Sequence, residues 1–342
     1  MRIAVIAPPW APVPPALYGG IELVVDRLAV GFKDAGHEVL LYTTGDSTSD
    51  VERRWVLEES EGQRIGMAVP ELRHVFHAYD EIARWGADVV HDHTVAGPFF
   101  AADHSPDVPV ATTIHGPFNA ELTDLYERIA SHTPIIAISN AQAASAPSVA
   151  VARVIHHGIS ASDFPVGSGT GGYCLFLGRM APEKGAHRAI AACKAAGVPL
   201  LMAAKMREAS ERAYFAEFVE PHLSDGVSYL GEVPHARKLE LLAHATALVN
   251  PIRWNEPFGL VMVEALACGT PVVAFAEGAA PEIIEHGTTG FLCDTADDMA
   301  SAITEAGSLD RRACRAAIEG YFSTGRMVDE HLSLFREMIS AR

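Results

Sequence analysis

One loop of this sequence carries two cations placed to bind a single anion. In the loop 178–185, Arg179 and Lys184 stand five positions apart, bounded by glycines, just before a predicted helix. Both cations are able to converge on one anion beside the positive end of that helix, which is the chemistry that binds a diphosphate. A solvated loop that only begins a helix at Pro182 is the alternative, and this loop alone does not decide between the two.

A second loop, 255–260, leads into a helix that contains Glu264. The backbone N–H groups of Phe258, Gly259 and Leu260 predict an anion cradle, and the glycine lets a phosphate approach closely. At about 1.5 Å per residue, Glu264 lies roughly 7.5 Å beyond Gly259 along the helix. It is therefore placed to accept hydrogen bonds from a hydroxyl pair attached to the phosphate. Acidic residues that merely favour the helix dipole are the alternative.

Two further features indicate a ligand-binding site less strongly. Gly19 and Gly20 open the first predicted helix and fit a phosphate or sugar contact, although tight turns use paired glycines as often. His115 follows a predicted strand, and a strand end is where ligands of open α/β sheets bind.

His91 and His93 would share one face of a strand, but no carboxylate or cysteine completes a metal-ligand set, so we expect no metal site.

Short apolar runs alternate with helical patterns along the whole chain, which predicts parallel sheets covered by helices. The expected strands are 3–7, 38–42, 88–90, 110–114, 135–138, 173–177, 199–203, 228–230, 247–250 and 272–274. The expected helices are 21–32, 186–196, 236–244, 259–267, 296–306, 311–319 and 326–339. The glycine-rich stretch 165–172 precedes a strand, so it fits a linker between two doubly wound domains better than a dinucleotide-binding loop.

The composition excludes several classes of protein. The chain has 342 residues, 49% of them hydrophobic, and a net charge of −17, which is ordinary for about two folded domains. Because nucleic acids and anionic membranes select clustered positive charge, we expect neither as a partner. The odd number of cysteines, without a CxxC pair, predicts reduced thiols in a cytoplasmic protein. We expect no signal peptide, and no apolar run reaches about 18 residues.

Four motifs together resemble a known family. They are FLGRMAPEKG at 176–185, EPFGLVMVEALACGTPVVA at 256–274, GGIE at 19–22 and the histidine–glycine pair at 115–116. In this order they are similar to retaining nucleotide-sugar glycosyltransferases of the GT-B fold, in the glycogen-synthase-like and sucrose-synthase-like group (glycosyltransferase family 4 type). The resemblance covers nearly the whole chain and implies an α/β fold with two Rossmann-like domains facing across a cleft.

The resemblance also implies a division of the chain. Residues 1–165 would form an acceptor-binding domain and residues 173–322 a nucleotide-sugar-binding domain. Residues 323–342 would form a helix that crosses back and packs on the N-terminal domain.

By the same resemblance, Arg179 and Lys184 match the cations that bind the donor diphosphate, and Glu264 matches the glutamate that binds the ribose hydroxyls. Glu256 matches the first glutamate of the family's E-x7-E pattern, near the donor sugar. The amides of 258–260 would complete the phosphate cradle.

Three more positions follow from the resemblance. Gly20 would approach the phosphates, Val233 lies in a Gly-x-Val segment that touches the base, and His115 matches a histidine near the 6-position of the sugar. Two segments depart from the family pattern: 205–207 replaces a glycine-rich turn that contacts the base and α-phosphate, and 253–255 is an addition before Glu256.

The expected activity is retaining transfer of a sugar from a nucleotide diphosphate donor, with UDP favoured, to a small or natural-product hydroxyl acceptor. The expected mechanism is front-face substitution without a metal or other cofactor, in antibiotic or glycoconjugate biosynthesis. A nucleotide-sugar epimerase, a phosphorylase or a non-catalytic sugar-nucleotide-binding protein would share the fold, and they remain open at this point. A tandem Rossmann dehydrogenase would need a dinucleotide loop, which the sequence lacks.

Overall fold

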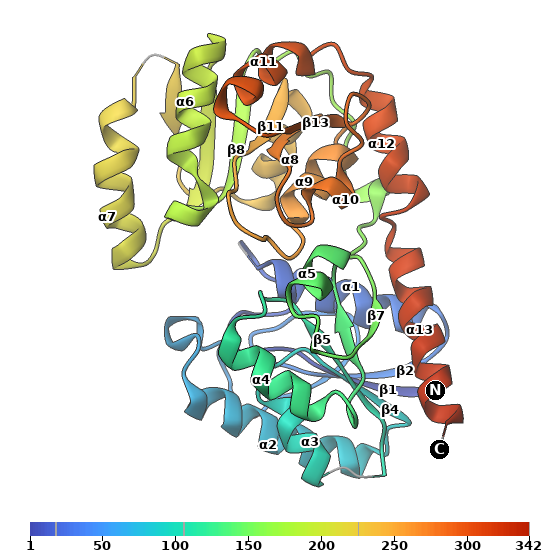
Figure 1. Ribbon diagram of the computed structural model, residues 1–342. Coiled ribbons are helices and arrows are strands. Elements are labelled where there is room, and N and C mark those ends of the chain that lie inside the picture. Colours follow the sequence, from blue (N-terminus) through green and yellow to red (C-terminus); the bar gives the residue numbers. More distant parts are fainter. Residues whose placement is uncertain (18, 105–106, 225, 342) are drawn as a thin grey trace. The chain divides into compact units, whose positions relative to one another are not determined.

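The computed structural model describes residues 1–17, 19–104, 107–224 and 226–341 (Figure 1). The chain divides into two compact units, and the first of them is discontinuous. Unit 1 consists of residues 1–158 and 324–342, and unit 2 consists of residues 159–323. Each unit is built around one parallel sheet.

Unit 1 contains, in chain order, β1 (Arg2–Ile6), α1 (Gly20–Asp34), β2 (Glu38–Tyr42), β3 (Glu52–Arg54), a 3-10 turn (Gly62–Arg64), α2 (Ala68–Trp85), β4 (Val89–Asp92), α3 (Gly97–His104), β5 (Val110–Ile114), α4 (Ala120–Ile129), β6 (Ile135–Ala137), α5 (Asn140–Ser145), β7 (Val151–Val154) and α13 (Thr324–Ser340). Its strand order is β3-β2-β1-β4-β5-β6-β7, all parallel. Because the order reverses direction between β1 and β4, the loops after these two strands flank the point where open α/β sheets bind ligands.

Unit 2 contains a 3-10 turn (Ala161–Asp163), β8 (Cys174–Arg179), a 3-10 turn (Pro182–Lys184), α6 (Ala186–Ala196), β9 (Leu200–Lys205), α7 (Ala209–Phe218), a 3-10 turn (Glu220–His222), β10 (Val227–Tyr229), α8 (His235–His244), β11 (Ala247–Asn250), α9 (Leu260–Ala267), β12 (Val272–Phe275), α10 (Ala280–Ile283), β13 (Gly290–Cys293), α11 (Ala296–Ala306) and α12 (Arg311–Gly320). Its order is β10-β9-β8-β11-β12-β13, also parallel. Here the direction reverses between β8 and β11.

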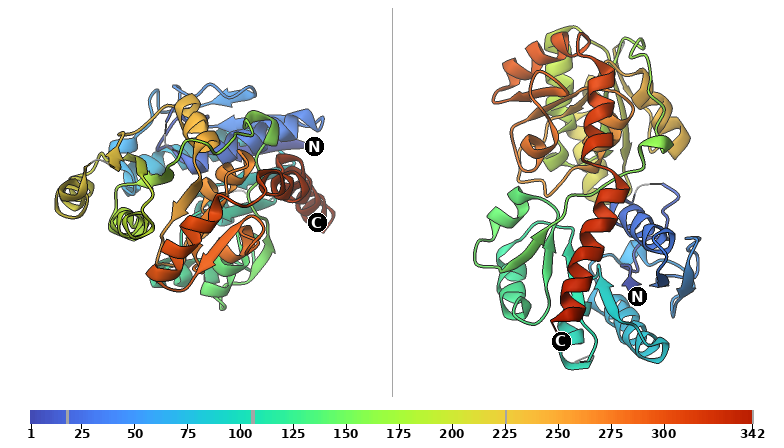
Figure 2. Two further views of the ribbon diagram at one scale, coloured as in Figure 1. Left: turned by 90° about the horizontal axis from the view of Figure 1, so that it is seen from above. Right: turned by 90° about the vertical axis from the view of Figure 1, so that its right-hand side faces the viewer.

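The last helix, α13, packs on unit 1, as expected from the sequence. It lies along α1, and the two helices remain side by side in both ribbon figures (Figure 2). A side chain at Gly31 of α1 would place its Cβ 2.4 Å from Cγ2 of Val328, so the glycine lets the two helices approach closely. The rings of Phe32 and Phe335 meet edge to face, with centroids 5.6 Å apart, which adds specific aromatic packing to the buried apolar area.

The glycine-rich stretch 165–172 packs on unit 2 instead of forming a free linker. A Cβ on Gly167 would lie 1.9 Å from the carbonyl oxygen of Ala243, so only glycine fits this approach. Arg311 of α12 donates to the Gly167 and Ala243 carbonyls and to the hydroxyl of Thr270. These glycines therefore serve close packing, which composition alone does not distinguish from flexibility.

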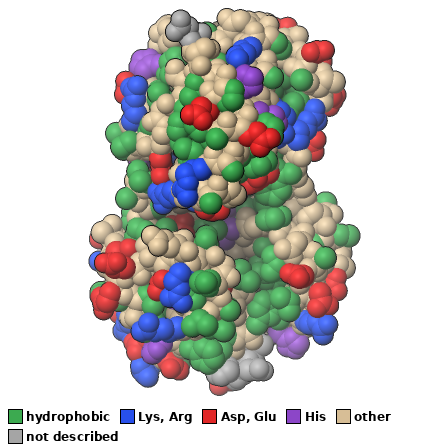
Figure 3. Space-filling view, turned by 90° about the vertical axis from the view of Figure 1, so that its left-hand side faces the viewer, with side chains coloured by type: hydrophobic (Ala, Val, Ile, Leu, Met, Phe, Trp, Pro, Cys, Tyr) green, Lys and Arg blue, Asp and Glu red, His purple; other side chains and the backbone are tan. Residues whose placement is uncertain are grey.

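The surface agrees with the acidic composition. On the face drawn in Figure 3, basic side chains lie beside acidic ones instead of gathering into a stripe. No described helix is both long and apolar enough to cross a bilayer. All five cysteines of the sequence are buried as free thiols.

Candidate functional site

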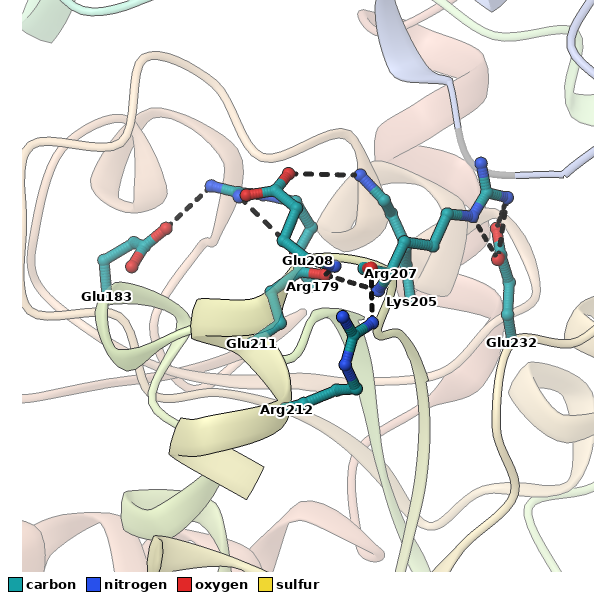
Figure 4. Close-up of polar contacts among 8 residues, drawn as sticks. All are labelled: Arg179, Glu183, Lys205, Arg207, Glu208, Glu211, Arg212 and Glu232. Carbon is teal, nitrogen blue, oxygen red and sulfur yellow. Dashed lines mark hydrogen bonds and ion pairs between the residues drawn. The ribbon is translucent and has the colours of Figure 1, made fainter. Parts of the chain in front are cut away.

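The cations expected to bind an anion lie in unit 2, at and just beyond the carboxyl end of β8. Arg179 is the last residue of β8, and its guanidinium donates to Oε1 of Glu183 at 2.7 Å. A second nitrogen lies 3.6 Å from Oε1 of Glu211, whose side chain is only 2% exposed. The other oxygen of Glu211 accepts the backbone N–H groups of Arg207 and Glu208 (Figure 4). Arg179 therefore neutralises a buried carboxylate at the base of this loop.

Lys184 ends the 3-10 turn that precedes α6. Gly185 follows with φ of 78°, a left-handed conformation that favours glycine, and it is the residue directly before α6. The Lys184 ammonium donates to Oε2 of Glu256 at 2.5 Å, and both side chains are mostly buried, with 15% and 16% exposed. It also lies 5.5 Å from the ring centroid of Trp254, within the range of a cation–π contact. The structure thus joins the expected diphosphate cation to the expected sugar-binding carboxylate.

The loop after β11 ends at the start of α9. Phe258 is buried, and Gly259 precedes the helix in a left-handed conformation with φ of 88°. The helix begins at Leu260 without a side-chain cap, so its first-turn amides suit an external acceptor. The backbone of Glu256 is fixed separately, because its N–H donates to the Trp254 carbonyl and its own carbonyl accepts from Ala279.

Glu264 lies in the second turn of α9 and is almost wholly buried, with 3% of its side chain exposed. Its Oε1 accepts from Nζ of Lys238 on α8 at 2.6 Å. The sequence did not single out Lys238. No local sequence pattern indicates Lys238, because its ion pair with Glu264 joins two helices and spans 26 positions.

The segment expected near a base lies between β10 and α8. Val233 is half-buried and stands before Pro234, the residue directly before α8. Its neighbour Glu232 accepts a bidentate pair of bonds from the guanidinium of Arg207 (Figure 4). Lys205, which ends β9, lies 3.8 Å from Glu208. The unusual segment 205–207 is therefore tied down by carboxylates on α7 and before α8.

The remaining expected residues belong to unit 1. Gly20 is the first residue of α1, and a Cβ built there meets nothing within 4 Å, so in unit 1 as described nothing packs against it. Glu22 in the same turn is buried, and burial raises the pKa of its carboxyl to about 7. The sequence contained Glu22 within the GGIE motif but gave it no role of its own.

His115 follows β5 and belongs to a cluster of histidines. Its Nε2 lies 2.8 Å from Nδ1 of His93, and its ring stacks on His157 with centroids 5.4 Å apart. The ring of His93 lies 4.0 Å from that of His91, which lies 4.9 Å from His331 on α13. Burial lowers the pKa of His115 to about 3 and places those of the other four below the usual range. The cluster is therefore neutral near pH 7.

Eight of the ten expected site residues lie in unit 2, and six of them cluster after β8 and β11, the strands that flank its switch point. Lys184 and Glu256 are brought into contact, whereas Gly20 and His115 belong to unit 1. Within the described ranges, no group of three or more histidine, cysteine, aspartate or glutamate side chains is arranged to hold a metal ion.

Comparison with known proteins identifies both halves of the chain. A model described as "Glycosyltransferase Family 4" matches residues 18–166, and one described as "Glycosyl transferases group 1" matches residues 163–319. Among curated proteins, a glycogen synthase of Mycobacterium tuberculosis is 27% identical over 93% of this chain and 89% of its own length.

Solved structures agree. AviGT4, a glycosyltransferase involved in avilamycin A biosynthesis, is 25% identical with a TM-score of 0.75, covering 100% of this chain and 98% of that one. Anabaena Alr3699/HepE in complex with UDP and glucose is 20% identical with a TM-score of 0.79, covering 98% and 99%. The expected family and fold are thereby confirmed. This chain belongs to the GT-B glycosyltransferases of the family 4 type.

Proposed function

We propose that the protein transfers a sugar from a nucleotide diphosphate donor to a hydroxyl group of a small or natural-product acceptor, with retention at the anomeric carbon. Unit 2 would bind the donor and unit 1 the acceptor. The observation that carries the proposal is the contact of Lys184 with Glu256 at 2.5 Å. In a nucleotide sugar the diphosphate and the sugar share one bridging oxygen. A cation for the first and a carboxylate for the second must therefore be neighbours, as these two are.

The donor base is proposed to be uracil. The solved relative HepE holds UDP and glucose, and AviGT4 is involved in avilamycin A biosynthesis. The net charge of −17 makes a polyanionic acceptor unfavourable. Calorimetry with UDP-, GDP-, ADP- and TDP-sugars tests the donor: we expect the tightest binding for a UDP-sugar, and a clear preference for another base would overturn this part.

The reaction is proposed to be a front-face substitution. The acceptor oxygen forms a bond to the anomeric carbon on the face that the diphosphate leaves, and the acceptor proton passes to the departing phosphate oxygen. Arg179, Lys184 and the first-turn amides of α9 would stabilise the charge that develops on that oxygen. Glu256 would orient the sugar hydroxyls. His115, neutral because burial lowers its pKa to about 3, would hydrogen-bond the sugar rather than carry charge.

The anomeric configuration of the product tests this mechanism directly. With a UDP-sugar and an accepted hydroxyl compound, NMR coupling constants should show that product and donor share one configuration. An inverted product would overturn the retaining assignment.

Dependence on divalent metal is a separate test. Because protein cations are proposed to neutralise the diphosphate, EDTA should leave the initial rate unchanged. Activity that EDTA abolishes and magnesium or manganese restores would show that a metal does this work instead.

A further inference from the structure

Lys238 is a cation paired with a buried carboxylate, and it has no role in the mechanism proposed above. It lies on α8, and its ammonium donates to Oε1 of Glu264 on α9 at 2.6 Å. Lys238 is partly exposed, whereas Glu264 is almost wholly buried. The ion pair therefore joins α8 to the carboxylate on α9 that is proposed to bind the ribose.

Glu264 depends on Lys238 because burial removes the water that would otherwise solvate its carboxylate. A buried carboxylate without a cation or several donors is strongly unfavourable. Two of the arginines of α12, which packs on α9, are engaged elsewhere: Arg311 donates to the Gly167 and Ala243 carbonyls, and Arg315 donates to the Ala267 carbonyl. In the part of the chain that the structure describes, Lys238 is the cation recorded as an ion-pair partner of Glu264.

The geometry divides the two oxygens of Glu264 between two tasks. Lys238 occupies Oε1, and a carboxylate offers a second oxygen with two further lone pairs. A hydroxyl that donates to an ionised, oriented carboxylate forms a stronger hydrogen bond than one that donates to a neutral acceptor. Holding Oε1 therefore fixes both the charge and the direction in which Oε2 is presented.

We propose that Lys238 is a positioning residue for ribose recognition: by holding Glu264 it determines how strongly the enzyme prefers ribonucleotides to deoxyribonucleotides. This inference rests on the proposed function, in which Glu264 accepts from the ribose hydroxyls. Lys238 itself touches neither the diphosphate nor the sugar in this account. An ion pair that merely fastens α8 to α9 would change the melting temperature but not this preference.

Binding of three nucleotides to the full chain tests the proposal. Calorimetry gives the Kd of UDP, 2′-deoxy-UDP and 3′-deoxy-UDP for the wild type and for Lys238→Met, Lys238→Arg and Glu264→Gln. The wild type should prefer UDP by about tenfold or more over at least one deoxy analogue, the factor that one buried hydrogen bond supplies. In Lys238→Met that preference should fall to about threefold or less, and Lys238→Arg should retain it.

The matched control lies on the same helix. Arg237 pairs with Glu240, and both side chains are exposed, so Arg237→Met removes a neighbouring cation without touching Glu264. It should leave all three affinities unchanged.

The outcomes distinguish the role of Glu264 from the role of Lys238. A wild type without ribose preference would remove both the role of Glu264 and this inference. If the wild type discriminates and Glu264→Gln does not, the role of Glu264 is supported. In that case, two results for Lys238→Met would overturn the inference alone. One is an unchanged preference for UDP over its deoxy analogues, and the other is an equal loss of affinity for all three nucleotides. In the Glu264→Gln background, Lys238→Met should not change the ratio further, since the two residues act as one unit.

Discussion

Substituting Glu256 with glutamine should raise the affinity for UDP while it abolishes most of the transfer activity. Without a donor, the ammonium of Lys184 is neutralised by Glu256 at 2.5 Å. The diphosphate of an incoming nucleotide must share or replace that partner. Glu256 is therefore a competitor for the phosphate and, in the proposed function, the ligand of the sugar.

The size of each effect follows from this contact. A hydrogen bond between charged groups contributes about 1.5 to 3 kcal/mol, and part of that is regained when UDP no longer has to displace Glu256. An affinity gain of about three- to tenfold is expected, since tenfold corresponds to about 1.4 kcal/mol. Turnover should fall at least about 100-fold, because a contact made to the reacting sugar is lost. The backbone bonds of residue 256 to Trp254 and Ala279 survive the change, so the loop keeps its shape.

Calorimetry with UDP and steady-state transfer kinetics measure the two effects, and Glu183→Gln is the control. Glu183 is a carboxylate of the same loop, but it pairs with Arg179, whereas Lys184 pairs with Glu256. Its substitution should change UDP affinity by about twofold or less, the range of a partly exposed pair. Parallel losses of UDP affinity and turnover in Glu256→Gln would contradict this role and make Glu256 a residue that shapes the phosphate loop.

Three further substitutions have defined outcomes. Arg179→Ala should weaken UDP binding about tenfold and lower the melting temperature, because the buried Glu211 loses its cation; unchanged UDP affinity in calorimetry would contradict the assignment. Burial raises the pKa of Glu22 from 4.5 to about 7, so stability falls as pH rises through that interval, and Glu22→Gln should recover up to about 3 kcal/mol at pH 8 in thermal unfolding. Burial lowers the pKa of His331 from 6.5 to about 4, so stability falls as pH drops through that interval; an unchanged acid slope in His331→Phe would show that another group is responsible.

Regular elements with a single clean period were predictable from the sequence. The strands 38–42, 110–114 and 247–250 and the helices 186–196 and 296–306 begin and end at the expected residues. The helix α2 was not anticipated, although it is 18 residues long. Its apolar residues are not confined to one face, because Val69, Leu72 and Phe76 are exposed on the face opposite its buried residues. The strand β3, with the sequence ERR, has no apolar period at all.

The site was predictable as a set of loops but not as a set of contacts. Residue types and the order of the motifs placed the two cations at and after the end of β8, and the expected anion cradle, which stays a prediction, before α9. Which carboxylate faces which cation depends on the sheet order, which brings together positions 72 apart in the case of Lys184 and Glu256. Likewise, His91 and His93 were expected to share one face, but the contact of His91 with His331 requires α13 to return to unit 1.

The discontinuity of unit 1 has a consequence for synthesis on the ribosome. Chains are made from the N-terminus at about 5 to 20 residues per second, so residues 1–158 emerge well before α13 exists. Until then the surface of α1 around Phe32, and the imidazole of His91, lack the cover that Phe335 and His331 supply in the finished fold. Residues 159–323, in contrast, form a continuous unit that is complete before the last helix is translated. The earlier half of the chain is thus completed only by a segment that is synthesised after the whole of the later half.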